Sequence, residues 1–597
     1  MLTAANVILL LFVGLNSART LYEASEVSQT DYDFIIVGAG TAGCVLANRL
    51  SASPNNYTVL VLEAGGSDAG VLELEVPAIA PSILANASLI WNYTTVEQPG
   101  LNNRALSYPR GRVLGGSSSI NFMYYTRGSR DDYDRFADFT GDEIWSWDNM
   151  FTYMLKAEDF VQPINGQPST GRIDPTDHGH DGSLLTTTTG FPFPFDDLVV
   201  ETSKTPINEF NFSYNEDVNS GNTIGTSWIQ STTGGGVRSS AATAYLHPVL
   251  ERDNLHVMYG AQVTKLDDVG GEATPDLRQV SFTTSTGEAL SARASKEVIL
   301  AAGAVNTPQL LLLSGIGDPT DLAALNITSL INAPAVGQEM QDHPLLAIQW
   351  TTNSTATLDS FTRNSTAVAD ALNQWIANRT GFDTTVATNL FSWVRLPDNS
   401  SAIETFGDPS AGPTSAHLEL LLVDYFISFA APSPESGAYL TMVLNVASPA
   451  SRGRVRLASS SPSQFPLIDP AFLTSDFDVD AMVTAMHAAE TFLATGPWAG
   501  MNLQRFGPWA SATTDAELAD VARAGITTFW HPCCTARMGK DDDSTAAITS
   551  KLLVKGATGV RVVDASVFPF IPAAHLQAPV YAIAERAVDI IFEAYAA

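Results

Sequence analysis

The sequence predicts an α/β fold built on a doubly wound, Rossmann-type dinucleotide-binding domain, and three observations support this. An apolar, β-rich run at residues 33–37 leads directly into the glycine-rich turn 38–43 (GAGTAG). Residues 44–50 then place apolar side chains at helical spacing. A second apolar strand, residues 58–62, ends in Glu63, twenty residues after the turn. The order strand, G-x-G-x-x-G turn, helix, strand and acid is the pattern of a dinucleotide site.

Each glycine of the turn has its own task in such a site. Gly38 permits the tight turn, Gly40 lets backbone N–H groups approach a pyrophosphate, and Gly43 lets the helix pack closely on the strand. The start of the helix presents its positive dipole end to the phosphates, and the acid accepts from ribose hydroxyls. The pattern alone does not separate FAD from NAD. It predicts these nucleotide-binding residues: Gly38, Gly40, Thr41, Ala42, Gly43 and Glu63.

Length and charge limit the classes of function. A chain of 597 residues has room for more than one domain at roughly 100–200 residues each. With 16% charged and 45% apolar residues, an intrinsically disordered chain is excluded. The 31 Lys and Arg against 63 Asp and Glu give a net charge of −32, which repels nucleic acids and anionic membranes. We therefore expect no nucleic-acid partner, no membrane partner and a monomer.

The first residues indicate the compartment. Residues 4–15 form an apolar run that is too short to span a bilayer, which takes roughly 20 residues. Its position is typical of a signal peptide, which we predict over residues 1–18. The alternative is an uncleaved hydrophobic N-terminus, because no Lys or Arg precedes the run and Asn16 is a poor residue near a cleavage site.

Potential glycosylation sites support secretion. Nine Asn-x-Ser/Thr sequons occur along the chain, at Asn56, Asn86, Asn92, Asn211, Asn326, Asn353, Asn364, Asn378 and Asn399. Their density predicts an extracellular, secreted glycoprotein. The three cysteines are too few for a disulfide framework, and no Cys-x-x-Cys pair indicates a metal site. We interpret Cys44 as a buried apolar residue, and Cys533 and Cys534 as free thiols.

Longer segments resemble a known family. Residues 108–122 (YPRGRVLGGSSSINF) and 303–317 (GAVNTPQLLLLSGIG) look like the two signature motifs of the glucose–methanol–choline (GMC) oxidoreductases, a family of FAD-dependent alcohol oxidases and dehydrogenases. Residues 530–532 (WHP) and 560–585 are similar to the catalytic ends of that family. The resemblance runs from about residue 31 to the end of the chain. Within the family it looks closest to fungal aryl-alcohol oxidases, followed by pyranose dehydrogenases.

The resemblance implies FAD as the cofactor. Glycines at 115 and 116 let the main chain lie against the flat flavin, and Ser117 offers a hydroxyl to a phosphate or to the ring edge. Some relatives carry a flavin-linked histidine near Ile120, so isoleucine there implies dissociable FAD. The backbone of Val263 would meet the adenine, although simple core packing is the alternative. The implied contacts beyond the first turn are Arg112, Leu114, Gly115, Ser117, Asn121, Phe122, Val263, Asp564, Ala565 and Gln577.

The resemblance also implies a catalytic pair, His531 and His575. Alcohol oxidation removes the hydroxyl proton as hydride leaves the adjacent carbon. A neutral imidazole, whose ordinary pKa is about 6.5, suits that task near neutral pH. We assign His531 as the base and His575 as the hydrogen-bonding partner that orients the alkoxide and helps to polarise the O–H bond. One residue departs from the family pattern. Cys534 stands where the family usually has Gly or Ser, and its added bulk predicts a constricted pocket or altered access of oxygen to the flavin.

Seven other histidines occur. His178 and His180, in the loop 177–182, suggest a metal, but a polar loop that resembles a family turn is the favoured interpretation. The remaining five have no partner pattern, and we assign them no role. No metal is predicted.

The substrate prediction depends on aromatic residues. Phe122 and Trp530 stand where aryl-alcohol oxidases carry aromatic side chains, which would stack on a flat substrate and exclude water. Residues 424–429 resemble a gating loop in which Tyr425, Phe426 or Phe429 narrows the entrance, with Phe426 assigned to the substrate site; an aromatic core cluster is the alternative. The leading hypothesis is oxidation of primary aromatic or allylic alcohols, with O2 reduced to H2O2. The alternatives are a sugar dehydrogenase that uses quinones, a hydroxynitrile lyase-like flavoprotein without net redox turnover, and a non-catalytic flavoprotein.

The expected domain organisation is discontinuous. The FAD-binding domain takes residues 31–155, 220–335 and 525–597, the last with the catalytic C-terminus. The substrate domain, of α+β type with an antiparallel sheet and helices, takes residues 156–219 and 336–524.

Overall fold

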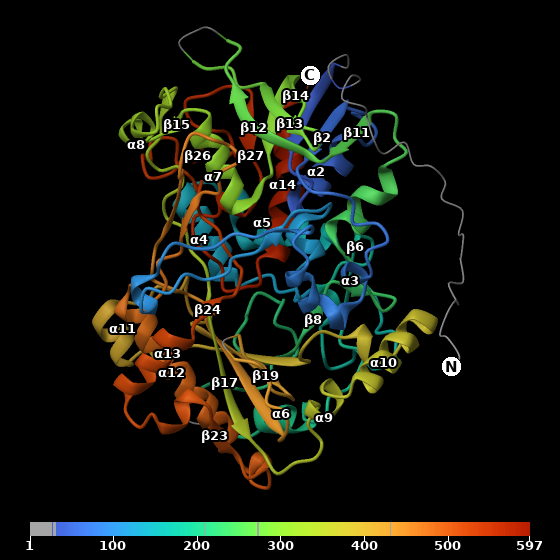
Figure 1. The fold of residues 1–597 in the computed structure, drawn as a ribbon, viewed down its shortest axis with the longest axis vertical. Coiled ribbons are helices and arrows are strands. Elements are labelled where there is room, and N and C mark those ends of the chain that lie inside the picture. The colour runs from blue at the N-terminus through green and yellow to red at the C-terminus, as the bar shows by residue number, and fades with distance from the viewer. Residues whose placement is uncertain (1–26, 28–30, 208, 271–273, 430, 597) are drawn as a thin grey trace, which may run out of the picture.

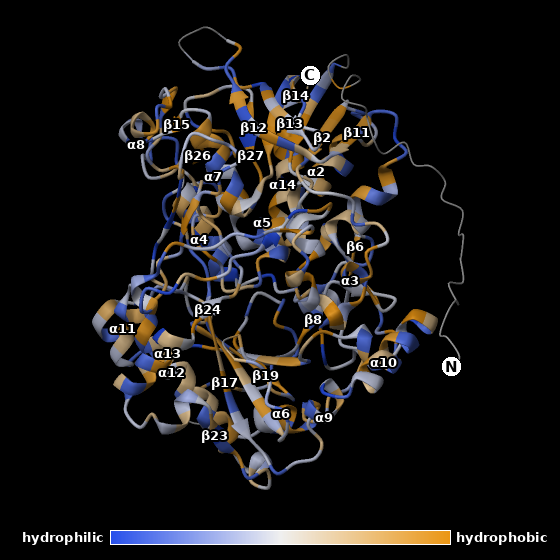
Figure 2. Cartoon of the chain, in the orientation of Figure 1, coloured by the Kyte–Doolittle hydropathy of each residue, from blue (hydrophilic) through white to orange (hydrophobic). Residues whose placement is uncertain are grey.

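The computed structural model describes residues 27, 31–207, 209–270, 274–429 and 431–596, so the predicted signal peptide lies outside the described residues. Two seven-stranded sheets organise the molecule, one in the upper half of Figure 1 and one in the lower half. Figure 2 shows hydrophobic residues concentrated in the strands of both sheets. Among the described residues, no helix is long and apolar enough to cross a membrane.

The first sheet has a parallel part and an antiparallel extension. Its strand order is β11-β2-β1-β14-β13-β12, with β27 pairing β14. The pairings of β11 with β2, β2 with β1, β1 with β14 and β14 with β27 are parallel. All five residues of β2 are buried, as expected for a parallel strand covered on both faces. The bounds are β1 (Tyr32–Val37), β2 (Val59–Glu63), β11 (Leu255–Tyr259), β12 (Ala261–Asp267), β13 (Gln279–Thr284), β14 (Ala289–Leu300) and β27 (Val560–Val562).

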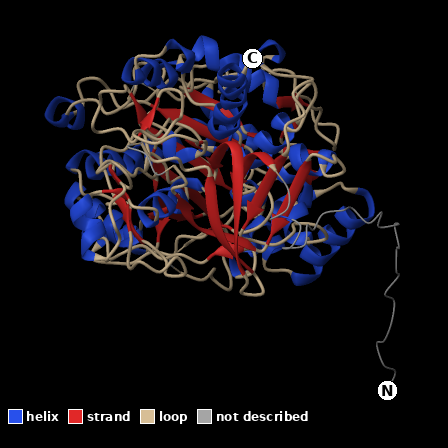
Figure 3. Ribbon diagram, turned by 90° about the horizontal axis from the view of Figure 1, so that it is seen from above, coloured by secondary structure: helices blue, strands red, loops and turns tan. Residues whose placement is uncertain are grey.

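Helices surround this sheet, as the view from above shows (Figure 3). Helix α2 (Thr41–Leu50) starts within the glycine-rich segment 38–43 and packs against α14 (Gln577–Tyr595). Helix α14 also packs against α5 (Trp147–Ala157), while α7 (Gly303–Leu313) follows β14 and packs on β12. The C-terminal helix α14 is therefore part of the nucleotide-binding domain.

The second sheet is antiparallel, with the order β23-β17-β20-β19-β18-β7 and with β24 pairing β17. Helix α12 (Asp476–Leu493) packs on β20 and β19, and α13 (Asp515–Gly525) packs on α12. The strand bounds are β7 (Gly225–Trp228), β17 (Pro344–Thr351), β18 (Leu390–Val394), β19 (Leu418–Val423), β20 (Tyr439–Val446), β23 (Gln504–Phe506) and β24 (Thr527–Thr528).

Shorter elements complete the two halves. The remaining α-helices are α3 (Leu72–Glu75), α4 (Arg130–Thr140), α6 (Asp196–Ser203), α8 (Pro319–Ala324), α9 (Asp359–Thr362), α10 (Ser365–Asn378) and α11 (Ser401–Phe406). The short strands are β3 (Ile90–Trp91), β4 (Arg110–Gly111), β5 (Glu158–Phe160), β6 (Leu184–Thr188), β8 (Gln230–Ser231), β9 (Thr233–Gly234), β10 (Val237–Arg238), β15 (Ile316–Gly317), β16 (Ile331–Asn332), β21 (Arg454–Arg456), β22 (Leu467–Asp469), β25 (Met538–Gly539) and β26 (Ile548–Thr549).

The predicted α/β class with a second, antiparallel sheet is confirmed. Two short strands differ from the predicted division. Strand β7 lies within residues 220–335 and β24 lies within residues 525–597, yet both pair in the second sheet. The reason is their length, because strands of four and two residues are too short to show an alternating pattern. The other predicted domain boundaries stay predictions.

A glycine substitution tests the close packing of the nucleotide turn. A Cβ added at Gly43 would lie 1.9 Å from the carbonyl oxygen of Gly38, whereas a Cβ at Gly66 would meet nothing within 4 Å. Overpacking of this kind typically costs about 1–3 kcal/mol, so Gly43→Ala should lower the thermal unfolding temperature and Gly66→Ala should not. Circular dichroism melts measure both. Equal melting of the two variants would contradict the described packing.

Candidate active site

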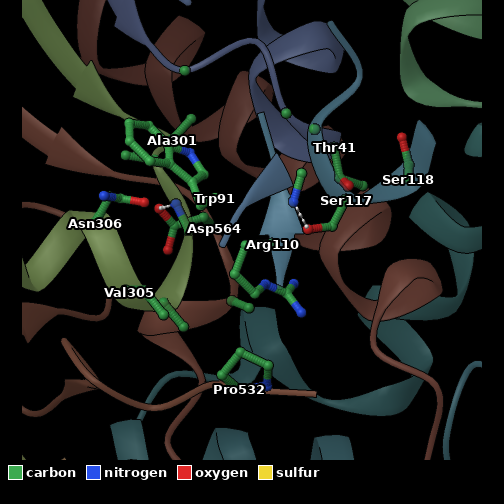
Figure 4. Close-up of a pocket in the computed structure, with 18 of the residues that line it drawn as sticks. Thr41, Trp91, Arg110, Ser117, Ser118, Ala301, Val305, Asn306, Pro532 and Asp564 are labelled. Atoms are coloured by element: carbon green, nitrogen blue, oxygen red, sulfur yellow. Dashed lines mark hydrogen bonds between the residues drawn. The ribbon is translucent and has the colours of Figure 1, made fainter. Parts of the chain in front are cut away.

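A long cavity follows the carboxyl ends of the parallel strands, which is where ligands bind in open α/β sheets. At one end it is lined by the turn after β1, by Glu63 at the end of β2 and by Ala301 and Ala302 after β14. Figure 4 shows Thr41, Ser117, Asn306 and Asp564 around this region. The other end is lined by Phe122, Trp530, His531 and His575. The cavity therefore joins the nucleotide motif to the predicted catalytic pair.

The carboxylate of Glu63 holds the nucleotide turn in place. Its Oε2 accepts from the backbone N–H of Ala39 at 2.8 Å, and its Oε1 accepts from that of Gly65 at 2.7 Å. Burial raises the pKa of Glu63, and these two backbone donors oppose the rise. A carboxylate has further lone pairs for ribose hydroxyls, so the residue fits the nucleotide role.

The two glycine motifs make close backbone contact. Gly40 lines the cavity, and a Cβ added there would have as neighbours only the Ala301 carbonyl at 3.8 Å and the Gly116 Cα at 4.0 Å. Gly116, with φ +55°, approaches so closely that its own Cβ would lie 2.7 Å from the Gly40 Cα. A side chain at Gly40 or Gly116 would fill space beside the glycine-rich turn. The backbone cradle therefore fits a dinucleotide pyrophosphate such as that of FAD.

Asp564 joins the end of β27 to the start of α7. Its Oδ2 accepts from the Gly303 N–H at 2.8 Å and from the Thr307 hydroxyl at 2.6 Å, and its Oδ1 accepts from the Ser566 N–H at 2.8 Å. Asp564 and Ala565 both line the cavity. The carboxylate of Asp564, at the end of β27, is therefore held in one position in the cavity lining.

Most predicted cofactor contacts line the cavity: Gly38, Gly40, Thr41, Ala42, Glu63, Ser117, Asn121, Phe122, Val263, Asp564, Ala565 and Gln577. Four do not, and they have supporting positions instead. Gly43 lies under the turn, and the Arg112 guanidinium stacks on Trp91 at 4.7 Å from the ring centre. The Gly115 N–H donates to the Ala39 carbonyl, and the Leu114 N–H donates to the Gly66 carbonyl. Direct contact of these four with a cofactor stays a prediction, because the sequence motif does not separate lining residues from their supports.

The two predicted catalytic imidazoles converge. The ring centroids of His531 and His575 are 4.9 Å apart, and the rings are nearly perpendicular at 88°. His531 follows β24, and His575 precedes α14. The backbone N–H of His575 donates to the hydroxyl of Thr126 at 2.6 Å, which fixes that loop. Residues 44 positions apart in the sequence thus meet at one end of the cavity.

Two further buried residues hold these imidazoles, and the sequence analysis missed both. His343 Nδ1 lies 2.9 Å from His531 Nδ1, and Glu419 Oε1 lies 2.8 Å from His575 Nε2. Burial, the charge of His575 and the neighbouring His343 and Arg110 hold the pKa of His531 well below its ordinary value. A signal for Glu419 existed, because it is the one charged residue in the apolar strand β19 (LELLLV). His343 has no such signal.

Asp342 ties the catalytic loop to the rest of the site. Its Oδ1 accepts from the backbone N–H groups of His343 and His531, each at 2.8 Å. Its Oδ2 accepts from the Tyr108 hydroxyl at 2.5 Å and from the Thr528 hydroxyl at 2.6 Å. Burial raises the pKa of Asp342 to about 6, so the carboxylate form prevails at neutral pH.

Aromatic side chains border the catalytic end. Trp530 lies 5.9 Å from Phe122 and 5.9 Å from Phe429, measured between ring centroids. Phe429 is 47% exposed. Phe426 is buried, and it packs on Tyr439 and Phe506 rather than lining the cavity. Phe426 therefore follows the core alternative, and Phe429, another of the gate candidates, lies beside Trp530.

The two neighbouring cysteines lie outside the cavity lining. Cys533 and Cys534 are buried free thiols, with 2.9 Å between their sulfur atoms. Cys534 has a φ of +71°, and its N–H donates to the Ala565 carbonyl. Its side chain does not line the cavity, so the predicted constriction of the pocket is not seen. Positive φ at this position explains why glycine suits it.

His178 has a structural position. Its ring is buried between Glu158 at 3.0 Å and Asp217 at 2.8 Å, and Arg127 pairs with the same Glu158. The flanking carboxylates raise the pKa of His178 to about 9 against the effect of burial. In the part of the chain that the structure describes, no group of three or more His, Cys, Asp or Glu residues is placed to hold a metal ion.

The fold and site define a class of protein, namely a two-domain oxidoreductase whose cavity is lined by a dinucleotide-binding motif and by paired imidazoles. Comparison with known families makes this specific. Models of the GMC oxidoreductases match residues 32–345 and 449–584. The chain belongs to the GMC oxidoreductase family, whose members bind FAD, so the predicted family and cofactor are confirmed.

Individual relatives cover nearly the whole chain. "Dehydrogenase eriK" of Hericium erinaceus is 38% identical, over 98% of this chain and 98% of that protein. Pyranose dehydrogenase 3 of Leucoagaricus meleagris is 37% identical, over 95% and 94%. A formate oxidase variant from Aspergillus oryzae superposes with a TM-score of 0.85 at 26% identity, over 95% and 99%. A fungal aryl-alcohol oxidase has a TM-score of 0.80 at 24% identity, over 95% and 100%, which shows a common fold.

Proposed function

We propose that this protein oxidises primary aromatic or allylic alcohols to aldehydes, with O2 as the electron acceptor and H2O2 as the second product. The observation that carries the proposal is the pair of imidazoles, His531 and His575, 4.9 Å apart at one end of a cavity whose other end holds the nucleotide motif. FAD, when bound, supplies the acceptor for the hydride. The residues of the chain supply the base, the orientation and the dry surroundings.

His531 is suited to remove the hydroxyl proton. Its lowered pKa keeps the ring neutral across the physiological range, so that its free nitrogen is available to accept a proton. No hydrogen-bond partner is found for its Nε2 among the described residues, and the residue lines the cavity. The assignment of His531 as base therefore has geometric support.

His575 is suited to orient the substrate hydroxyl and to share the positive charge that develops when the proton is removed. Its Nε2 donates to Glu419, a carboxylate that is fully buried and also accepts from the Asn445 amide at 3.1 Å. A buried carboxylate behind an imidazole fixes the ring and stabilises positive charge that develops on it. His575 is therefore the second imidazole, which hydrogen-bonds the substrate hydroxyl while His531 acts as the base.

The walls of the catalytic end favour a flat, apolar alcohol. Phe122, Phe529 and Trp530 line it, and such rings bind apolar surface and exclude water. The nearby guanidinium of Arg110 already donates to the Trp530 carbonyl at 2.6 Å. A substrate with many hydroxyl groups would leave polar atoms unpaired against these rings, at a cost of about 1–3 kcal/mol each.

The second candidate is a sugar dehydrogenase with a quinone acceptor. Pyranose dehydrogenases are among the relatives, at 35–37% identity over nearly the whole chain. This likeness favours sugars and quinones, whereas the aromatic walls favour aromatic alcohols. An experiment with both substrate classes separates them.

We also propose that the protein is a secreted, extracellular glycoprotein. Of the nine sequon asparagines, eight are exposed and Asn86 is half-buried, so the nitrogen of each can be reached by glycan transfer. Treatment of the secreted protein with peptide N-glycosidase F should lower its mass by the weight of several glycans. An unchanged mass would contradict the proposal.

Flavin bleaching identifies the substrate and the acceptor. Anaerobic addition of a benzylic alcohol to the holoenzyme should bleach the flavin absorbance, because the aromatic walls bind the ring beside the two imidazoles. Reoxidation by air should then be at least as fast as reoxidation by benzoquinone. Bleaching by glucose alone would select the sugar dehydrogenase, and faster reoxidation by benzoquinone would select a dehydrogenase. No bleaching together with cyanohydrin cleavage would select the lyase.

Removal of the base should slow flavin reduction. His531→Ala should lower the rate constant by about 10²–10⁴-fold, as is typical for loss of a general base, with the flavin still bound. His180→Ala, at an exposed position, is the control and should match the parent protein. Because the pKa of His531 is lowered, the reduction rate of the parent should stay level as the pH falls through 6.5. Stopped-flow absorbance measures each rate, and near-normal reduction in His531→Ala would remove it from the base role.

A further inference from the structure

We propose that His343 is a positioning residue that accepts a hydrogen bond from His531 Nδ1 and so fixes the tautomer in which His531 Nε2 is free to act as base. The inference rests on the proposed function for its consequence, but the tautomer itself exists without any substrate. The observations are the hydrogen bonds on the two nitrogens of His343 and the backbone contacts that hold both rings.

The proton of His343 has a fixed place. The ring is completely buried, and its Nε2 lies 3.0 Å from the carbonyl oxygen of Ala447. A carbonyl oxygen only accepts, so Nε2 must carry the proton. Burial and the charge of nearby His575 lower the pKa of His343 to about 3, so the ring holds one proton and not two. Its Nδ1 is then a lone pair that can only accept.

The acceptor role of His343 Nδ1 determines which nitrogen of His531 carries the proton. The two Nδ1 atoms are 2.9 Å apart, and a hydrogen bond needs a proton between them. Because Nδ1 of His343 can only accept, Nδ1 of His531 must donate. His531 is itself neutral, since burial, His575, His343 and Arg110 all lower its pKa. A neutral imidazole with its proton on Nδ1 has a free lone pair on Nε2.

The backbone keeps the two rings in this arrangement. One oxygen of Asp342 accepts from the N–H groups of both His343 and His531, each at 2.8 Å. The rings meet edge to face, at 86° and 5.1 Å between centroids. Rotation of the His343 ring would break its bond to Ala447, and rotation of either ring would break the bond between the two Nδ1 atoms. The other imidazole, His575, is backed by the carboxylate of Glu419 instead, so the two histidines are prepared for different tasks.

Three substitutions of His343 separate the hydrogen bond from the packing. Asn carries an amide oxygen at the position of Nδ1 and keeps an acceptor for His531. Leu fills similar volume without an acceptor. Gln places its amide near the position of Nε2, so it keeps the contact with Ala447 but offers no acceptor to His531, and it serves if His343→Leu does not fold. Flavin content and melting temperature establish which variants are intact.

The decisive measurement is the ¹⁵N spectrum of histidine-labelled holoenzyme without substrate, with the His531 signals identified by their loss in His531→Ala. The parent and His343→Asn should show the proton of His531 on Nδ1. His343→Leu and His343→Gln should show it redistributed to Nε2. Their flavin-reduction rate constant should fall about 10–100-fold, the usual effect of losing a residue that orients a reactive group, with KM within about twofold.

The outcomes distinguish this inference from the proposed function. If His343→Leu or His343→Gln keeps the proton on Nδ1, or reduces flavin as fast as His343→Asn, the inference is overturned while the function stands. If the tautomers change as expected but no alcohol bleaches the flavin, the positioning role stands and the proposed function fails.

Discussion

The geometry of the catalytic end depends on one buried carboxylate, that of Asp342. It accepts four hydrogen bonds, from the Tyr108 and Thr528 hydroxyls and from the backbone of His343 and His531. A buried charge is costly unless it is fully hydrogen-bonded, so these donors and the carboxylate require one another. Three segments that are far apart in the sequence are thereby held at a single point. Removal of the carboxylate would leave four buried donors without an acceptor.

The two sheets supply different halves of this site. The parallel sheet provides the nucleotide cradle through Glu63 and Asp564, whose carboxylates accept from backbone N–H groups and, at Asp564, also from the Thr307 hydroxyl. The antiparallel sheet provides Glu419 on β19 and the strand β17, which begins directly after His343. His531 therefore lies where the two sheets meet. This position allows the hydride acceptor and the proton acceptor to be supplied by separate structural units.

Local features were predictable from the sequence, and contacts between distant segments were not. The glycine turn and Glu63 form a continuous pattern, and His531 and His575 lie in segments that resemble a family. His343 and Glu419 became visible only in three dimensions, because they contact histidines that are 188 and 156 residues away. Among the gate candidates Tyr425, Phe426 and Phe429, the sequence could not show that Phe426 is buried and Phe429 exposed, since a run of aromatic residues does not reveal which ring is buried. Likewise, Arg112, Leu114 and Gly115 belong to the right motif but support the cavity from behind.

The partly exposed ring of Phe429 is a position at which the substrate preference of the enzyme can change. Its ring centroid lies 5.9 Å from that of Trp530, whereas the two catalytic imidazoles are held by His343 and Glu419. Replacement of the Phe429 ring would change the surface beside Trp530 and leave the hydrogen bonds of His343, Glu419 and Asp342 in place. Related enzymes can therefore diverge in substrate preference through the loop that carries Phe429, while the residues that handle the proton stay the same.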